Sequence, residues 1–274
     1  MQMIIVADNL TITNPVISDA IAGRDPKPIA NMVRACVAAG ADAIDINPGP
    51  LKKNAAEIMT FLVETVQAAT TTPLLLDTTS AEAIGAGLAA ARNRIIINGF
   101  SLEPQKCRDI LPLAKTFGVD IIGYILRPDS SVPTEAAEFF EIALELIEAA
   151  QKAGVAIDRL IIDPVVAPLI WDNGAAHNRA LLSFLSRRED LAGAPLRSIA
   201  GLSNLSAGRA PAEKKRLVQK TFLPMMAAVG LDMVLMDVFQ ADVTAAAKAC
   251  DLITGEKIFS WAAIGGMPTT SWIL

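Results

Sequence analysis

The sequence alternates between short, apolar, β-rich runs and longer amphipathic segments, and the pair repeats eight times along 274 residues. Alternating strands and helices predict a parallel sheet, because each helix returns the chain to the start of the next strand. Runs such as 160–164, Leu-Ile-Ile-Asp-Pro, lack the polar alternation of a half-exposed strand. Helices must therefore cover the sheet. Eight such units favour a closed (β/α)8 barrel.

The predicted strands are aliphatic, and they cover residues 3–9, 43–49, 73–77, 94–98, 120–126, 159–163, 197–204 and 233–237. Between them, apolar residues recur at helical spacing. The predicted helices include 28–40, 134–154, 212–230 and 244–255. Pro28 suits the first turn of a helix, and Gly40 suits a C-cap. Thr134 is the predicted N-cap of its helix.

An open, doubly wound sheet is the alternative to a barrel. Such a sheet normally has a glycine-rich phosphate-binding loop after its first strand. Here the first strand is followed by residues 9–13, Asn-Leu-Thr-Ile-Thr, which match no such loop. No linker interrupts the pattern, so we expect one barrel domain over residues 1–274. Its apolar tail, residues 265–274, suits three roles equally: closing the barrel floor, joining a subunit interface, or fraying.

The charge and hydropathy patterns narrow the function classes. The chain has 24 basic and 29 acidic residues, a net charge of -5, whereas a protein that binds nucleic acid needs a basic excess. No apolar stretch approaches the ~20 residues of a membrane-spanning helix. The first residues lack the basic region and long apolar core of a signal peptide. We therefore expect a cytoplasmic protein that binds neither nucleic acid nor membranes.

The cysteines and the single histidine give no sign of a metal site or a nucleophilic triad. Cys36, Cys107 and Cys250 are far apart in sequence and form no CxxC motif, so we expect reduced core thiols. Zinc sites that activate thiols use Cys and His together. His177 is the only histidine and has no supporting motif. We expect it at the surface or at a helix start.

Acidic and amide side chains gather where the predicted strands end. In (β/α)8 barrels the active site lies at the C-terminal ends of the strands. Lys and His are absent from these ends, which instead carry Asp8, Asn9, Asp45, Asn47, Asp77, Asn98, Asp163, Asn204 and Asp237. Each position alone is better explained as a turn or helix cap. The set as a whole favours a binding site.

This set of residue types restricts the chemistry. Because the strand ends carry no lysine, a Schiff-base aldolase is excluded. Because they carry neither His nor Lys, a proton-abstracting isomerase is disfavoured. Ionised Asp accepts two parallel N–H bonds, whereas Asn both donates and accepts. The combination suits a flat heterocycle with an amide-like edge and an exocyclic amine, such as a pterin. A divalent metal held by the carboxylates is the less favoured reading.

Several segments together resemble the pterin-binding methyltransferases, which have a barrel like that of dihydropteroate synthase. The resemblance runs in order from about the first strand to the last helix. The most specific part is Asp45-Ile46-Asn47-Pro48-Gly49-Pro50 combined with Gly201-Leu202-Ser203-Asn204. The other matching segments are 76–79, 95–98, 162–164, 222–223 and 230–232.

The resemblance implies roles for the matching residues. Asp77, Asn98 and Asp163 would hold the pterin edge, and Asn204 would contact the nitrogen that carries the methyl group. The remaining pterin-binding positions would be Asp45, Asn47, Gly201 and Ser203. Asn204, Asp163 and Asp77 are therefore the candidate catalytic residues.

The resemblance also implies the reaction. A methyl group would pass, in either direction, between N5 of tetrahydrofolate and methylcobalamin, with no metal in the barrel. The chain has no DxHxxG segment around His177, so the corrinoid would be carried by a separate partner protein. The family further implies a homodimer.

One departure and three alternatives qualify this resemblance. Where the family often has Glu-Arg-Ile-Asn, this chain has Asp8-Asn9-Leu10-Thr11, so no role is assigned to Asp8. A dihydropteroate synthase-type enzyme would need a pterin-holding lysine and basic residues for pyrophosphate, which the strand ends lack. A pterin barrel without catalysis would be expected to lose Asn204 or Asp163, and both are present. A metal-dependent barrel lyase would be inhibited by a chelator.

Overall fold

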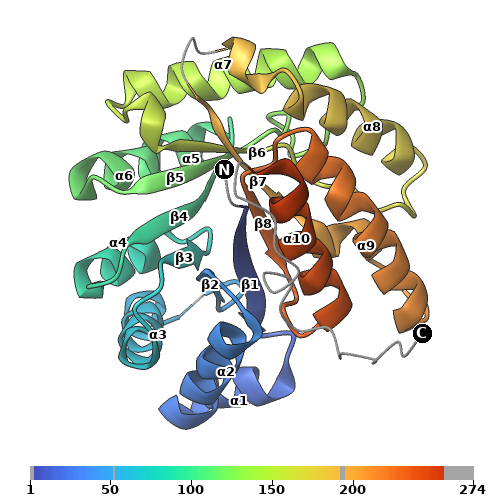
Figure 1. The fold of residues 1–274 in the computed structure, drawn as a ribbon. Helices are drawn as coiled ribbons and strands as arrows, with labels where there is room; N and C mark the ends of the chain where they lie inside the picture. The colour runs from blue at the N-terminus through green and yellow to red at the C-terminus, as the bar shows by residue number, and fades with distance from the viewer. Residues whose placement is uncertain (1–2, 52, 192–194, 256–274) are drawn as a thin grey trace, which may run out of the picture.

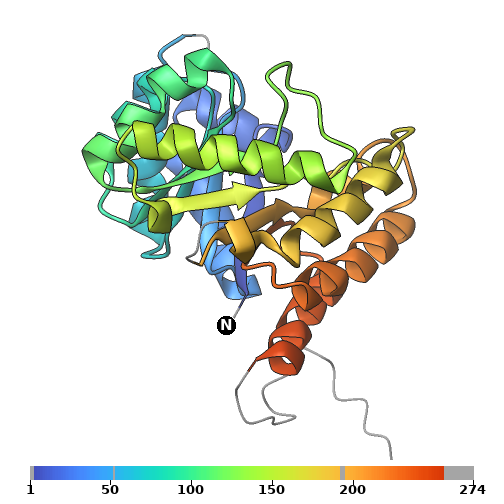
Figure 2. The ribbon, with the colours of Figure 1, turned by 90° about the horizontal axis from the view of Figure 1, so that it is seen from above.

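The computed structural model describes residues 3–51, 53–191 and 195–255. Its eight strands are parallel, pair in sequence order and close on themselves, since β1 pairs with both β2 and β8. This confirms the predicted (β/α)8 barrel, with the helices outside the strands (Figures 1 and 2). The strands are β1 (Ile4–Thr11), β2 (Ala43–Asn47), β3 (Leu74–Asp77), β4 (Ile95–Phe100), β5 (Asp120–Tyr124), β6 (Leu160–Asp163), β7 (Arg197–Gly201) and β8 (Met233–Met236).

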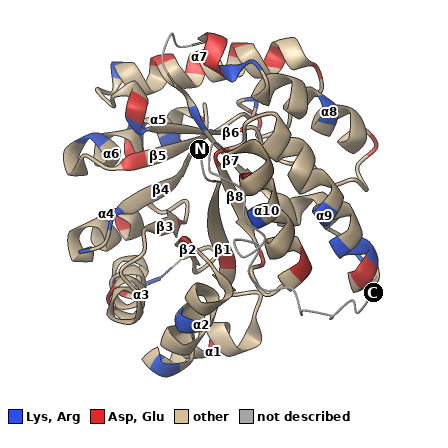
Figure 3. Ribbon diagram, viewed as in Figure 1, with Lys and Arg blue, Asp and Glu red and all other residues tan. Residues whose placement is uncertain are grey.

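The outer layer consists of α-helices that return the chain to the start of each strand. They are α1 (Pro15–Gly23), α2 (Pro26–Ala39), α3 (Ala55–Ala69), α4 (Ala81–Ala90), α5 (Pro104–Asp109), α6 (Leu111–Phe117), α7 (Ala136–Lys152), α8 (Gly174–Leu185), α9 (Ala212–Ala228) and α10 (Ala241–Thr254). Three short 3-10 helices are η1 (Ile157–Arg159), η2 (Arg188–Leu191) and η3 (Leu202–Ser206). Acidic and basic residues are interspersed over these helices (Figure 3).

Three predicted helix starts require correction. The helix expected from residue 244, α10, begins at Ala241. The helix expected from Pro28 begins at Pro26, because the Asp25 side chain accepts a hydrogen bond from the Lys27 amide and caps it. Thr134 does not cap α7; Glu135 holds the N-cap position without a side-chain hydrogen bond. Gly40 is confirmed as a C-cap, in the left-handed conformation that glycine adopts readily.

The core has two layers. Most buried apolar residues lie between the strands and the helices. A smaller cluster fills the inside of the barrel, with one residue from each strand: Val6, Ala43, Leu75, Ile96, Ile122, Ile161, Ile199 and Met233. Such a layer makes the barrel interior a packed core rather than a pore. It also fixes which residues of each strand point inward.

Six predicted strand ends are wrong. β2 stops at Asn47 rather than at residue 49, β5 at Tyr124 rather than at residue 126, and β8 at Met236 rather than at residue 237. β1 continues past Asn9 to Thr11, because its pairing with β2 shifts register between Ala7 and Leu10. β4 runs on to Phe100 through a similar irregularity. β7 stops at Gly201, and the following residues, predicted as strand up to Asn204, form the 3-10 helix η3.

His177 and the cysteines occupy buried or partly buried positions. His177 lies at the start of α8, as expected, but it is fully buried, so the prediction of a surface position is wrong. Among the described residues the three cysteines are free, with Cys36 and Cys250 buried and Cys107 partly buried. No described helix has the length and apolar character needed to cross a bilayer. The predicted roles of residues 265–274 lie outside the described residues.

Candidate functional site

A ring of polar side chains lies directly above the apolar layer inside the barrel. Side chains along a strand alternate between its faces, so the residue two positions after each inward apolar residue also points inward. These next residues are Asp8, Asp45, Asp77, Asn98, Tyr124, Asp163, Gly201 and Leu235. Six of these eight positions are polar, and all lie toward the C-terminal ends of the strands. The register of the barrel thus gathers them at its mouth.

Three members of this ring form a hydrogen-bonded chain across β2, β4 and β5. The Tyr124 hydroxyl donates to Oδ1 of Asn98 at 2.6 Å, and Nδ2 of Asn98 donates to Oδ1 of Asp45 at 3.1 Å. Asp45 and Asn98 are 2% and 6% exposed, so water does not compete for these bonds. The second oxygen of Asp45 and one N–H of Asn98 stay available to a ligand.

Asp77 is oriented by a neighbouring turn. Nδ2 of Asn47 donates to Oδ2 of Asp77 at 2.6 Å, and the backbone N–H of Gly49 donates to Oδ1 of Asn47 at 3.0 Å. Gly49 has a φ of 66°, and a side chain there would collide with Ile12. The predicted segment 45–50 therefore forms a turn that requires glycine, and this turn orients two of the expected site residues, Asn47 and Asp77.

Asp163 is held by the loop after β6, and the buried histidine of α8 supports this loop. Oδ1 of Asp163 accepts a 2.7 Å hydrogen bond from the backbone N–H of Val165, a β-branched residue with a φ of 57°. Such a residue avoids this conformation unless its surroundings hold it there. His177 does so: Nε2 lies 2.6 Å from the Val165 carbonyl oxygen and Nδ1 lies 2.5 Å from that of Pro133. His177 is therefore a support of the site.

The carboxyl groups of the ring have raised pKa values. Burial raises the pKa of Asp77 from 3.8 to about 6 and that of Asp163 to about 7, and the charge of Asp77 adds to the second shift. Burial, and then the charge of Asp77, hold the pKa of Asp45 well above its usual value. Part of the ring therefore retains protons near neutral pH. A ligand that donates hydrogen bonds must displace them.

A second polar group joins β1 to η3 and to the residue that follows β8. The Ser203 hydroxyl donates to Oδ2 of Asp8 at 2.7 Å, and Nδ2 of Asn9 donates to Oδ1 of Asp237 at 2.5 Å. Burial is the main cause that raises the pKa of Asp8 to about 6, and the charge of Asp237 contributes. Asp8 and Asn9 lie at the register shift of β1, where a bulge redirects side chains.

The candidate residues after β7 are not all joined to the ring. Gly201 occupies its own position in the ring, and Ser203 reaches Asp8. Asn204 is exposed, and no described residue forms a hydrogen bond with its side-chain amide. It lies on η3 at the same end of the barrel. Its amide is thus open to a ligand or a partner.

Sequence reasoning gave no role to Asp8, Asn9 or Asp237, although all three were noted at strand ends, and it did not select Tyr124. Ile122 and Val6 point into the barrel, and Tyr124 and Asp8 lie two positions after them. Knowing which residues face inward would therefore have identified both. Among the described residues, no group of three or more His, Cys, Asp or Glu side chains is arranged to hold a metal ion. The carboxylates instead take N–H groups from Asn98, Asn47 and Val165, and each keeps a second oxygen.

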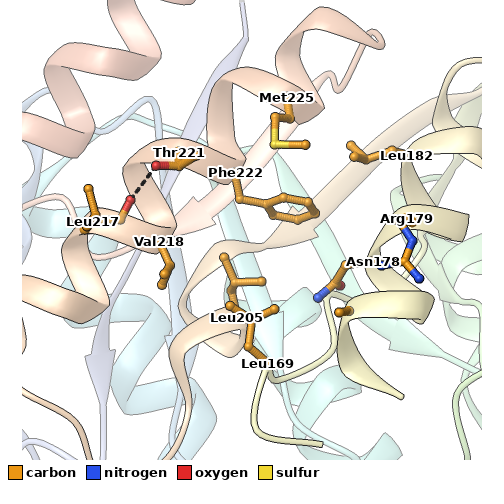
Figure 4. A pocket seen from close by; sticks show the side chains of 11 residues that line it. Leu169, Asn178, Arg179, Leu182, Leu205, Leu217, Val218, Thr221, Phe222 and Met225 are labelled. Carbon is orange, nitrogen blue, oxygen red and sulfur yellow. Dashed lines mark hydrogen bonds between the residues drawn. The ribbon is translucent and has the colours of Figure 1, made fainter. Parts of the chain in front are cut away.

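A separate apolar pocket lies on the outside of the barrel between α8 and α9 (Figure 4). Phe222 of α9 points into it, and Leu182 and Arg179 border it on the α8 side. Most of its lining residues are apolar, Asn178, Arg179 and Thr221 being the polar ones, and it shares no residue with the ring. This pocket lacks the polar groups that a heterocycle would require.

The chain is similar to a known protein family and to a named relative. The family model described as "Pterin binding enzyme" matches residues 9–237. The chain is 28% identical over 261 residues, 92% of each chain, to a protein from Eubacterium limosum described as "Methylcorrinoid:tetrahydrofolate methyltransferase".

Solved structures share the fold. A dihydropteroate synthase from Stenotrophomonas maltophilia superposes with a TM-score of 0.69 at 20% identity, covering 94% of this chain and 95% of that one. A dihydropteroate synthase from Xanthomonas albilineans superposes with a TM-score of 0.68 at 21% identity, covering 93% of this chain and 94% of that one. The family model spans the barrel from the bulge of β1 to the end of β8. The chain therefore belongs to the pterin binding enzyme family.

Proposed function

We propose that this protein transfers a methyl group between N5 of tetrahydrofolate and a corrinoid carried by a separate protein. The observation that carries the proposal is the ring of Asp45, Asp77, Asn98 and Asp163, each with a hydrogen-bonding position still open. The name of the Eubacterium limosum relative supports the same reaction. The strand ends carry no lysine for the dihydropteroate synthase alternative.

In this proposal the ring binds the pterin edge. Asp77 and Asp163 accept hydrogen bonds from the ring N–H and the exocyclic amine, because a carboxylate accepts two parallel N–H bonds. Asn98 complements them as a mixed donor and acceptor, and Asp45 holds Asn98 in place. Asn47, Gly201 and Ser203 complete the pocket wall. The apolar layer beneath the ring sets the depth to which the pterin can enter.

The transfer step is an in-line displacement. With 5-methyltetrahydrofolate as donor, cob(I)alamin supplies the electron pair of the new cobalt–carbon bond, and the N5–carbon pair returns to N5. A tertiary amine leaves poorly unless N5 is protonated or hydrogen-bonded, so a group that stabilises charged N5 lowers the barrier. Asn204, with its open amide, is assigned this contact. In the reverse direction N5 attacks the methyl group of methylcobalamin.

Anaerobic spectroscopy of methylcobalamin, tetrahydrofolate and the protein tests the reaction. We expect the methylcobalamin band to decay while cob(I)alamin and 5-methyltetrahydrofolate accumulate, and we expect EDTA to leave the rate unchanged. An unchanged spectrum together with tight tetrahydrofolate binding indicates that the cognate corrinoid protein is required. No reaction and no tetrahydrofolate binding would refute the proposal, and a rate lost with EDTA would favour a metal-dependent lyase.

The family resemblance implies a homodimer, and we also propose that its two copies associate through the pocket between α8 and α9. Leu217, Met225 and Leu169 border this pocket and are 65%, 46% and 43% exposed. Apolar side chains clustered around a groove mark surfaces that become covered by a partner. A second copy would bury them against the same surface of its own α8 and α9, as a two-fold interface requires.

Leu217→Asp is expected to convert the dimer to a monomer, because it places a carboxylate in an interface from which water is excluded. Sedimentation velocity at several concentrations measures the change, and we expect the dimer dissociation constant to rise at least about tenfold. The matched control is Leu144→Asp, since Leu144 is 44% exposed on α7 and lies outside the pocket. A monomeric wild type, or equal effects of the two variants, would contradict the proposed interface.

A further inference from the structure

Three large apolar side chains are exposed at the mouth of the barrel. Ile170 and Trp171, in the loop between β6 and α8, are 70% and 47% exposed, and Phe239, in the loop between β8 and α10, is 48% exposed. In the part of the chain that the structure describes, the loops after β2, β3, β4 and β5 carry no exposed large apolar side chain. These three residues, the apolar rim, therefore lie on one side of the mouth.

The β6 side of the apolar rim lies next to η3, the short helix that carries Asn204. The backbone N–H of Leu169 donates to the carbonyl oxygen of Leu205 at 3.0 Å. A Cβ atom added at Gly208, just after η3, would lie only 2.8 Å from Cδ1 of Ile170. The apolar rim therefore begins directly beside the helix that presents the open asparagine amide.

Phe239 borders the other side of η3. Oδ1 of Asp237 accepts hydrogen bonds from the backbone N–H of Phe239 and from Nδ2 of Asn9. The residue before Asn9 on β1, Asp8, accepts a hydrogen bond from Ser203 of η3. These bonds tie the loop after β8 to η3 through β1. Exposed apolar side chains thus flank η3 on both sides.

The proposed transfer restricts where the corrin ring can lie. In an in-line displacement the cobalt, the methyl carbon and N5 lie on one line, and the cobalt is at the centre of the corrin plane. The plane is therefore perpendicular to this line and spreads sideways from a point above N5, the atom assigned to Asn204. The corrin ring is much wider than a pterin, and its faces carry methyl and methylene groups. Contact between these groups and exposed apolar side chains beside η3 releases water and stabilises the complex.

We propose that Ile170, Trp171 and Phe239 form the subsite that binds the corrin ring, so that the corrinoid is seated off-centre, over the β6–β8 side of the mouth. The inference rests on the proposed function, since it takes the methyl group to be transferred between cobalt and N5. It places the apolar contacts of the corrinoid on loops that hold none of the pterin-binding carboxylates, so the two substrates can be tested separately.

Binding of methylcobalamin in the presence of saturating 5-methyltetrahydrofolate tests the subsite, because both ligands are already methylated and no transfer occurs. Equilibrium dialysis measures the dissociation constant of methylcobalamin. We expect Trp171→Ala and Phe239→Ala each to raise it about tenfold, and the double variant to raise it about 100-fold. The dissociation constant of 5-methyltetrahydrofolate should change less than about threefold in each variant, which also shows that the barrel is folded.

Phe117→Ala is the matched control, because Phe117 is 42% exposed at the end of α6, just before β5 starts at the opposite end of the barrel. It should bind both ligands like the wild type. Equal methylcobalamin affinities in the wild type, the rim variants and this control would overturn the inference. A wild type that binds 5-methyltetrahydrofolate but no methylcobalamin would also overturn it. In both cases the proposed function stands.

Sedimentation velocity on the same variants separates a corrin subsite from a subunit interface, since Leu169, the residue before the apolar rim, lines the pocket between α8 and α9. Loss of self-association in the rim variants with unchanged methylcobalamin binding assigns the apolar rim to the interface and overturns the inference. A wild type that binds neither ligand overturns the proposed function and this inference with it.

Discussion

Replacing Asn204 with alanine is expected to slow methyl transfer by about 100-fold or more while changing the tetrahydrofolate dissociation constant by less than about threefold. The expectation follows from where Asn204 lies. Its side chain is exposed on η3 and has no hydrogen-bond partner among the described residues, whereas the pterin edge is assigned to β2–β6. An interaction that strengthens only as N5 becomes charged changes kcat without changing ground-state binding.

Single-turnover kinetics with methylcobalamin, paired with calorimetric titration of tetrahydrofolate, measures both quantities on the same preparation. Asn31→Ala is a suitable control, because Asn31 is an exposed asparagine on α2, away from the barrel mouth. Equal losses of rate and of binding would show that Asn204 holds the pterin in the ground state. Its assigned contact with N5 would then be wrong.

The barrel was predictable because local patterns agree with the global fold. Aliphatic runs without alternation require covered faces, and eight of them in a row leave few alternatives to closure. The strand ends were less accurate, since the sequence does not reveal register. The bulge at Asp8 and Asn9 extends β1 to Thr11, and the turn after Gly201 coils into η3. Both departures depend on contacts between strands.

The site was predictable in part. Asp45, Asp77, Asn98 and Asp163 were found because each ends an apolar run, and the register brings these four into one ring. Tyr124 was not assigned, because a tyrosine at a strand end is unremarkable until the inward-facing positions are known.

The burial of His177 was missed for a similar reason. Asn173 and Gly174, which precede it, suggest a turn at the surface. The carbonyl groups that enclose it belong to Pro133 and Val165, which are remote in sequence. Contacts of this kind leave no pattern in the local sequence.

Asp163→Asn is expected to make the ligand-free protein more stable than the wild type at pH 8 and about equally stable at pH 4. Burial raises the pKa of Asp163 from 3.8 to about 7, so the folded state binds a proton that the unfolded state releases between these values. Folded-state stability therefore falls as pH rises through this window. Each unit of pKa shift corresponds to about 1.4 kcal/mol, so removing the charge should add roughly 2–4 kcal/mol above pH 7.

Urea denaturation at pH 4, 6 and 8 measures this difference directly. Asp172→Asn is the matched control, because Asp172 is an exposed aspartate in the loop between β6 and α8. The control should follow the wild type at every pH. A variant that is destabilised equally at all three pH values would show that the carboxylate carries no buried charge in the folded protein.

The stabilised variant should also bind tetrahydrofolate at least about 100-fold more weakly, because an amide offers an N–H where the pterin also donates. In the wild type, binding must ionise Asp163, so calorimetry in buffers of different ionisation enthalpy should detect proton release near pH 7. If the variant is stabilised but the wild type releases no proton on binding, Asp163 is already ionised before the pterin binds. Its buried charge then destabilises the folded protein. Where proton release is detected, affinity should decline as pH falls below 7, because Asp163 must then give up a proton when the pterin binds.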